Sequence, residues 1–238
     1  MREPKHDKER QDFQLERFTF FTDGVCAICI TLLVIEIKVP ELPLPTDHLL
    51  WQSISHLSLR FLGFVISFGI IGHYWSVHHR IFGYVVKYTT GLLWLNLAFL
   101  FTVVLLPFSS GFLGQYSSYS NLKLPYAVYT FNMVLTGLMN CWLWLYVSNP
   151  KRKMLSREIS RARIKLGLYR SLVIPVVFFI SFLVSLFLPI ISKLILLLIP
   201  IILHWGMKGL EKRAEIEEIQ EHKLAAEGKA AHTIKQIS

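Results

Sequence analysis

Long apolar stretches separated by short basic segments dominate the pattern of residues along the chain. A helix that crosses a bilayer needs about 20 mainly apolar residues, and six stretches approach that length. The pattern therefore predicts six transmembrane helices, at residues 18–37, 59–77, 90–113, 126–147, 168–188 and 190–207. Pro189 separates the last two, which we expect to form a tight helical hairpin. The predicted organisation is an N-terminal segment at 1–17, a membrane domain at 18–207, and a C-terminal helix or tail at 208–238.

Lysine and arginine are unevenly divided between the two sets of predicted loops. The terminal segments, the loop after the second span and the linker at 151–170 carry 21 of the 25 Lys and Arg residues, whereas the other side carries Lys38, Lys123 and Lys193. The positive-inside rule places the basic side in the cytoplasm. We therefore expect a multi-pass protein of the plasma membrane with both termini cytoplasmic. We also expect an amphipathic helix at 151–165 on the inner leaflet.

The composition excludes several classes of protein. Hydrophobic residues make up 53% and charged residues 17% of the 238 residues, and a soluble domain carries about 25% charged residues. We therefore attribute the net charge of +9 to loop orientation and expect the lipid bilayer, and no nucleic acid, as a partner. The three cysteines, two of them in an apolar run, exclude a disulfide scaffold. Motifs for metal-dependent hydrolysis, acyl transfer and nucleotide binding are missing from the sequence, so we expect neither an enzyme nor a cofactor.

Polar residues inside the first three spans are candidates for a function, because such residues are costly in a bilayer. Thr22 and Asp23 lie about one turn inside the first span, next to Arg17 at its mouth. Antiparallel packing of the second and third spans brings three candidate hydrogen-bond partners to the same level: His73, Trp75 and Asn96. We expect these bonds to tie the first span to its neighbours, and a cation or proton site at Asp23 is the alternative. We expect His78 and His79 at the membrane interface.

One side of the first span carries a stripe of small and aliphatic residues. Steps of three and four residues align Gly24, Ile28, Leu32 and Ile35, and Thr31 lies beside them. An apolar stripe on a membrane helix usually faces lipid or packs against a neighbour. The residues alone therefore leave a pore-lining role as one alternative.

The start of the first span also resembles a known signature. Arg17-x-x-x-Phe21-Thr22-Asp23 is similar to the RxxxF(S/T)D motif of the transmembrane protein 175 family. The members of this family are potassium-permeable channels of lysosomes and prokaryotes. Thr22 stands where Ser is commoner and keeps the hydroxyl group. The resemblance continues in short segments at 24–36, 73–75, 78–80, 94–96 and 106–109. Animal members carry two six-span units, so a chain with one unit resembles a prokaryotic member.

The resemblance implies an all-α homotetramer in which the first span of each subunit lines a central pore. It implies that Ile28 forms the narrowest ring, that Leu32 and Ile35 form further apolar rings, and that Thr31 favours potassium. Potassium ions would then pass near Ile28 and Thr31.

An apolar ring offers no ligand to a cation and gates by losing and regaining water. The chain lacks a TVGYG-type filter, so we expect a hydrophobic gate. Two alternatives remain open at this point. One is a proton-permeable channel that uses Asp23 and His73, and the other is a non-conducting membrane scaffold.

Overall fold

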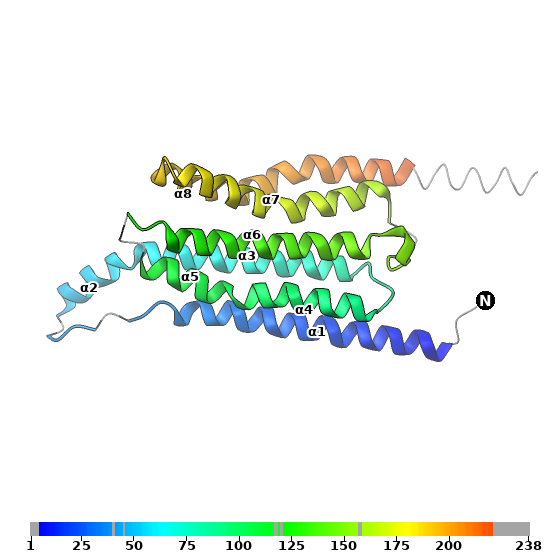
Figure 1. Cartoon of the computed structure of the whole chain (residues 1–238), viewed down its shortest axis with the longest axis horizontal. Coiled ribbons are helices and arrows are strands. Elements are labelled where there is room, and N and C mark those ends of the chain that lie inside the picture. Colours follow the sequence, from blue (N-terminus) through cyan, green and yellow to red (C-terminus); the bar gives the residue numbers. More distant parts are fainter. Residues whose placement is uncertain are drawn as a thin grey trace, which may run out of the picture.

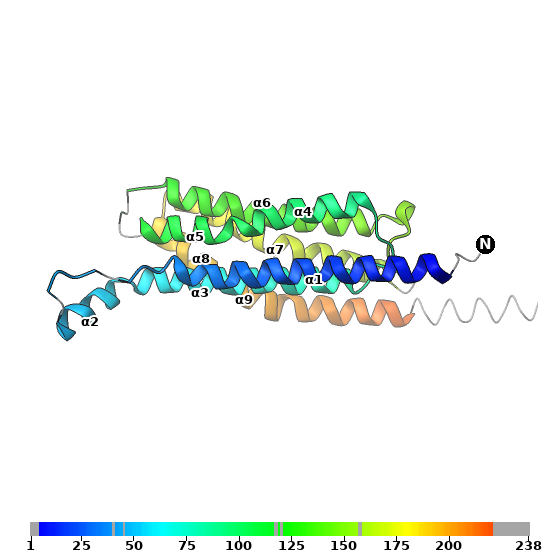
Figure 2. The same ribbon diagram turned by 90° about the horizontal axis from the view of Figure 1, so that it is seen from below.

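A computed structural model describes residues 5–39, 41–44, 46–116, 119, 121–156 and 159–220 of the chain. These residues form an elongated bundle of helices that lie side by side (Figures 1 and 2). The helices are α1 (Lys5–Ile35), α2 (Asp47–His56), α3 (Ser58–Phe82), α4 (Thr90–Val104), α5 (Leu106–Gln115), α6 (Leu124–Val147), α7 (Arg161–Ser185), α8 (Pro189–Leu196) and α9 (Leu198–Ile201). A 3₁₀ turn spans Pro150–Arg152 and a π-helical turn spans Ile202–Gly206, after which residues 207–220 continue as helix.

Side-chain caps and prolines define several helix starts. The hydroxyl of Thr89 accepts a hydrogen bond from the backbone N–H of Leu92 at the start of α4, and Ser160 does the same for Arg163 at the start of α7. Helices α5, α6 and α8 begin with proline in their first turn, where the missing N–H costs nothing. These local signals place the helix boundaries within the long apolar stretches.

Four helical segments are long and apolar enough to cross a membrane: Glu9–Ile35, Arg60–Phe82, Thr90–Gln115 and Arg161–Ser185. They correspond to the first, second, third and fifth predicted spans. Helix α6 coincides with the predicted fourth span at 126–147, although it is not one of these four segments. The chain is therefore an all-α protein with several membrane helices.

The last predicted span is not one regular helix. Helix α8 ends at Leu196, α9 lasts one turn, and the π-helical turn follows before regular helix resumes at 207. Pro200 lies inside this stretch and supplies no backbone N–H to the helical ladder. The predicted hairpin at Pro189 is confirmed, because α8 packs against α7 and the Ser181 hydroxyl donates to the Ser192 carbonyl at 2.6 Å.

The predicted amphipathic helix at 151–165 is wrong for residues 153–156. These residues run alongside the segment after α3, where the N–H of Val86 donates to the Met154 carbonyl at 2.8 Å and the N–H of Ser156 donates to the Tyr84 carbonyl at 3.0 Å. The helix starts only at Arg161, and residues 157 and 158 of the predicted segment lie outside the described residues. Basic periodicity alone gave no signal for this backbone pairing.

The two ends of the described chain lie at the same end of the bundle. The beginning of α1 and the end of the C-terminal helix lie at the same end of the bundle, on opposite sides of it in Figure 1, whereas α2 lies at the other end (Figures 1 and 2). Helical structure is continuous across the predicted boundaries at 17/18 and at 207/208. The shared position of the ends agrees with an even number of membrane crossings.

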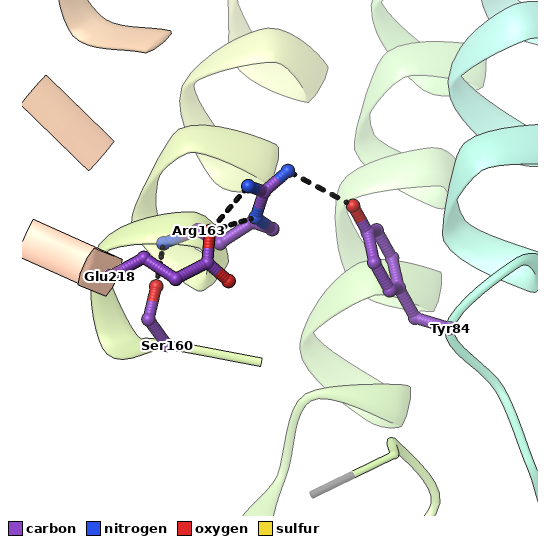
Figure 3. Close-up of polar contacts among 4 residues, drawn as sticks. All are labelled: Tyr84, Ser160, Arg163 and Glu218. Carbon is purple, nitrogen blue, oxygen red and sulfur yellow. Dashed lines mark hydrogen bonds and ion pairs between the residues drawn. The ribbon is translucent and has the colours of Figure 1, made fainter. Parts of the chain in front are cut away.

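The C-terminal helix at 207–220 lies along the start of α7 and is held there by two ion pairs. Arg163 pairs with Glu218, and Arg170 pairs with Glu211, so the partners are seven residues apart on both helices. Arg163 also donates to the Tyr84 hydroxyl at 3.2 Å, as Figure 3 shows. Arg163 therefore joins three separate parts of the chain.

We expect the two ion pairs to protect the C-terminal helix from proteolysis. Glu211→Gln combined with Glu218→Gln removes both carboxylate charges. Surface ion pairs contribute about 0.2–1 kcal/mol each, so we expect the loss of both to cost about 1 kcal/mol in total. Tryptic cleavage at exposed Lys212 and Arg213 should then accelerate roughly fivefold. A loss of about 1 kcal/mol raises the population of molecules in which the C-terminal helix is detached by about that factor. Glu215→Gln, at an exposed position of the same helix, is the control. Equal cleavage rates in all three proteins would show that the ion pairs do not hold the helix.

Candidate pore-lining helix and its hydrogen-bond network

Helix α1 presents one face to the bundle and leaves the opposite face uncovered. The buried face carries residues that are at most 6% exposed: Phe18, Thr22, Cys26, Cys29 and Leu33. These residues recur every three or four positions and face α3, α4 and α5. The uncovered face includes Phe21, which is 54% exposed, and Ile28, which is 59% exposed. Within one subunit, the predicted stripe therefore has nothing packed over it.

A chain of buried hydrogen bonds links α1, α4 and α3. The Thr22 hydroxyl donates to the Phe18 carbonyl at 3.1 Å and accepts from Nδ2 of Asn96 at 2.9 Å. Oδ1 of Asn96 lies 2.7 Å from Nε2 of His78. Because an amide oxygen can only accept, Nε2 of His78 carries the proton. All three side chains are fully buried, so one amide satisfies groups on two neighbouring helices.

Aromatic rings fix the position of His78 within this chain. Its ring stacks on Phe82 at a centroid distance of 4.3 Å and lies nearly parallel to Phe99 at 5.5 Å. His78 is therefore buried inside the bundle, whereas His79 is exposed, and the expected depth of both residues at the membrane interface stays a prediction. Spacing alone gives no decisive signal, because His78 follows the buried Tyr74 by four residues and Trp75, which is 41% exposed, by three.

A second hydrogen bond joins α1 and α3 at a more exposed level. Nε1 of Trp75 donates to Oδ1 of Asp23 at 2.8 Å. The Trp75 side chain is 41% exposed, and its ring lies 5.8 Å from that of His79. Asp23 is thus engaged by a neutral indole donor, as expected for a carboxylate that helps to position α1 against α3.

The structure brings together four of the seven residues of the predicted network: Thr22, Asp23, Trp75 and Asn96. Arg17 is exposed and its guanidinium lies over the ring of Phe13, 5.7 Å from the centroid. Phe21 points away from the bundle on the same face as Ile28. His73 faces α7 and the segment after α8, where it lines a cavity. Arg17 and Phe21 therefore extend the uncovered stripe, and His73 belongs to another part of the molecule.

Thr31 and the aliphatic stripe share the uncovered side of α1. Leu32 is 39% exposed and Ile35 is 68% exposed. The Thr31 hydroxyl donates to the Ile28 carbonyl at 2.8 Å and is itself exposed. Its proton is therefore directed back at the helix, and the oxygen lone pairs face outward. Such an oxygen can accept from water or contact a cation.

Among the described residues, no three His, Cys, Asp or Glu side chains come close enough to form a metal site. Beyond Arg17 and Phe21, the uncovered face of α1 therefore offers aliphatic groups and the hydroxyl oxygen of Thr31.

Residues 17–107, from the signature through α3 and α4, match the family described as "Endosomal/lysosomal potassium channel TMEM175". A potassium channel of Streptomyces collinus is 32% identical over 158 residues, which cover 63% of this chain and 76% of that protein. The chain belongs to the TMEM175 family. A potassium channel of a Chryseobacterium species is 35% identical over 122 residues, and here the match covers 51% of this chain and 59% of its relative.

The fold agrees with membership of the TMEM175 family. The crystal structure of a lysosomal potassium-selective channel TMEM175 homolog from Chamaesiphon minutus matches with a TM-score of 0.67. The match covers 84% of this chain and 98% of that one at 24% identity. At that identity the likeness supports the helical arrangement of a multi-pass membrane protein and assigns no residue.

We expect Asn96 to be the residue on which the attachment of α1 depends. Asn96→Leu leaves the Thr22 hydroxyl and the His78 ring buried without their partner, at a cost of about 1–3 kcal/mol. Thr22→Val removes one bond, for which membrane proteins average about 0.6 kcal/mol. Adding Thr22→Val to Asn96→Leu should therefore cost little more. Reversible unfolding in mixed micelles measures these free energies.

Thr19→Val is the matched control for this cycle. Thr19 also donates to a carbonyl of its own helix, that of Leu15 at 3.0 Å, but it is outside the chain of buried bonds. Its effect should add to that of Asn96→Leu. Full additivity for Thr22→Val as well would show that Thr22 and Asn96 are energetically independent.

Proposed function

We propose that this TMEM175-family protein is a potassium-permeable channel of the plasma membrane, assembled as a homotetramer around α1. The observation that carries the proposal is the uncovered apolar face of α1, on the helix that bears the family signature. Ile28, Leu32 and Ile35 lie on that face. Nothing within a single subunit packs against them, so they are free to contact other subunits. The potassium-channel names of the bacterial relatives support the permeant ion.

Four copies of α1 around an axis would place four Ile28 side chains in one ring. An aliphatic ring supplies no ligand to a cation, so a narrow ring excludes both water and ions. A small outward displacement of the four helices then admits water and the hydrated ion. Thr31 lies one turn beyond Ile28 and directs its oxygen lone pairs outward, so four hydroxyls there replace part of the ion's hydration shell. Potassium ions would pass next to these two rings.

In the full proposal, the chain crosses the membrane six times. The six crossings are the four long apolar segments, α6, and the interrupted segment formed by α8, α9 and the following turn. The described chain ends lie at one end of the bundle, and the excess of Lys and Arg at that end favours the cytoplasm.

The proton-channel alternative with Asp23 and His73 receives less support. Asp23 bonds to Trp75 on the side of α3 that faces α1, whereas His73 lines a cavity against α7. The two groups therefore do not form a pair. Potassium flux in proteoliposomes supports the proposal, proton flux at potassium equilibrium supports the alternative, and flux of neither ion supports a scaffold.

We expect Ile28→Asn to open the pore. Four amide groups in the ring provide hydrogen bonds for water, so potassium flux should rise several-fold and the preference over sodium should fall. Flux into proteoliposomes, measured with each ion, tests the change.

Val34→Asn is the matched control, since Val34 is 53% exposed but lies about a third of a turn from Ile28 at 3.6 residues per turn. Ile30→Asn would be a poorer control. Ile30 contacts the buried core, so that substitution would also weaken packing. Similar flux in Ile28→Asn and Val34→Asn would exclude a pore-facing Ile28.

We expect Thr31→Val to lower the preference for potassium over sodium more than it lowers total flux. The substitution keeps the shape of the side chain and removes the oxygen that contacts the ion. Reversal potentials under bi-ionic conditions measure the preference directly. Thr31→Ser keeps the oxygen and should retain the preference, so an equal loss in Thr31→Ser and Thr31→Val would show that the hydroxyl does not contribute.

A further inference from the structure

Three arginines line a small pocket between the end of α3 and the first half of α7. Arg80 comes from α3, and Arg163 and Arg170 come from α7. The pocket has a volume of about 20 Å³, which is close to the space that one water molecule needs. Its remaining walls are mainly apolar and consist of Val77, Ile81, Tyr84, Trp144 and Gly167. Three positive charges therefore share a site that offers them little water.

Two of these arginines are paired with carboxylates of the C-terminal helix. Nε and Nη2 of Arg163 both donate to the same oxygen of Glu218, and Nη1 donates to the Tyr84 hydroxyl (Figure 3). Arg170 pairs with Glu211 through Nη2 alone. The Arg170 side chain is 15% exposed, whereas that of Glu211 is 46% exposed. Each carboxylate thus binds one guanidinium through one oxygen.

Arg80 is the third cation of the pocket and has no carboxylate of its own. Within the described part of the chain, it forms neither an ion pair nor a side-chain hydrogen bond. Three arginines and two glutamates leave one positive charge in excess. Because like charges in a partly buried site repel one another, an anion that contacts all three guanidiniums stabilises the pocket more than the two carboxylates do.

A phosphate monoester has the shape and charge for this arrangement. It presents three equivalent oxygens and carries a charge of about −1.5 to −2 at neutral pH. Guanidinium groups bind phosphate through pairs of parallel hydrogen bonds, and Arg80 and Arg170 have N–H groups available for them. The pocket lies toward the end of the bundle where the chain ends gather, and basic pockets on the cytoplasmic side of membrane proteins bind phosphorylated lipid headgroups.

We propose that the pocket binds a phosphate monoester in exchange for the two carboxylates of the C-terminal helix. The phosphate oxygens take the places of Glu218 on Arg163 and of Glu211 on Arg170, and they also contact Arg80. Since the pocket holds only about one water molecule as it stands, the phosphate enters when the carboxylates withdraw. The C-terminal helix is therefore an internal competitor for the site. No residue of α1 lines the pocket, and binding does not depend on conduction.

Native mass spectrometry of the full-length protein in detergent micelles at neutral pH tests the proposal. The probes are dioctanoyl phosphatidic acid, dioctanoylglycerol and glycerol 3-phosphate. We expect phosphatidic acid to bind about tenfold more tightly than dioctanoylglycerol, which has the same chains and no phosphate. Glycerol 3-phosphate distinguishes the two sources of the phosphate: weaker binding than phosphatidic acid indicates a lipid headgroup, and equal binding indicates a soluble phosphate ester.

Arg80→Gln is the decisive variant, because it removes a charge from the pocket without breaking either ion pair. It should weaken the binding of phosphatidic acid about tenfold, since charge-assisted hydrogen bonds are lost. Arg161→Gln is the matched control. Arg161 is exposed on the same end of α7 and does not line the pocket, so its loss should leave the affinity unchanged.

Removing the competitor should have the opposite effect. Glu211→Gln combined with Glu218→Gln should raise the affinity for phosphatidic acid several-fold. Glu215→Gln combined with Glu217→Gln makes the same change of charge on the same helix, away from the pocket, and controls for general attraction of anions. In the unsubstituted protein, bound phosphatidic acid should also accelerate tryptic cleavage at Lys212 and Arg213, because the C-terminal helix is released.

Three results would overturn the proposal. Equal binding of phosphatidic acid and dioctanoylglycerol would mean that only the alkyl chains are recognised. The same affinity in Arg80→Gln, Arg161→Gln and the unsubstituted protein would mean that the phosphate binds elsewhere. Binding without faster tryptic cleavage would mean that the phosphate does not replace the carboxylates. The first and third comparisons need no variant, so the proposal is testable even if Arg80→Gln fails to fold.

Discussion

The buried amide of Asn96 is the contact that determines how α1 sits in this subunit. It donates to Thr22 and accepts from His78, so a single side chain sets the relative depth of three helices. A sliding or rotation of α1 by one residue would leave Thr22 away from Asn96, and buried polar groups are costly without partners. The aliphatic core around Cys26, Cys29 and Leu33 tolerates small shifts more readily. The polar contact therefore defines the register, and the apolar contacts supply the area.

Once the register is set, the opposite side of α1 is also determined. That side divides into two flanks. One carries Ile28, Leu32 and Ile35, and the other carries Phe20 at 71% exposure and Val34 at 53%. In a ring of subunits, each central helix faces the axis on one flank and a neighbouring subunit on the other. The exposed apolar side of α1 is thus wide enough to contact both the axis and a neighbouring subunit.

The sequence predicted the long apolar helices well, because the hydropathy and the length of a segment can both be read directly from its residues. It also predicted Thr22, Asp23, Trp75 and Asn96 as one group, since antiparallel packing fixes their level. It failed where the outcome depends on rotation about a helix axis or on distant backbone. His73 and His78 both lie within one antiparallel helix, and only the packing decides that His78 faces Asn96. Residues 153–156 avoid the helix because residues 84–86 offer backbone partners, and no local pattern encodes that pairing.

The energies indicate how such a subunit can hold a helix in register and still let it move. Hydrogen bonds inside membranes average about 0.6 kcal/mol, so the bonds of Asn96 to Thr22 and His78 contribute on the order of 1 kcal/mol in total. Driving a two-state equilibrium from 1:99 to 99:1 takes about 5.5 kcal/mol. The polar chain therefore cannot alone keep a gate closed. It selects one register, and in the proposed channel the balance between open and closed states has to come from apolar contacts, such as those among the four proposed Ile28 side chains.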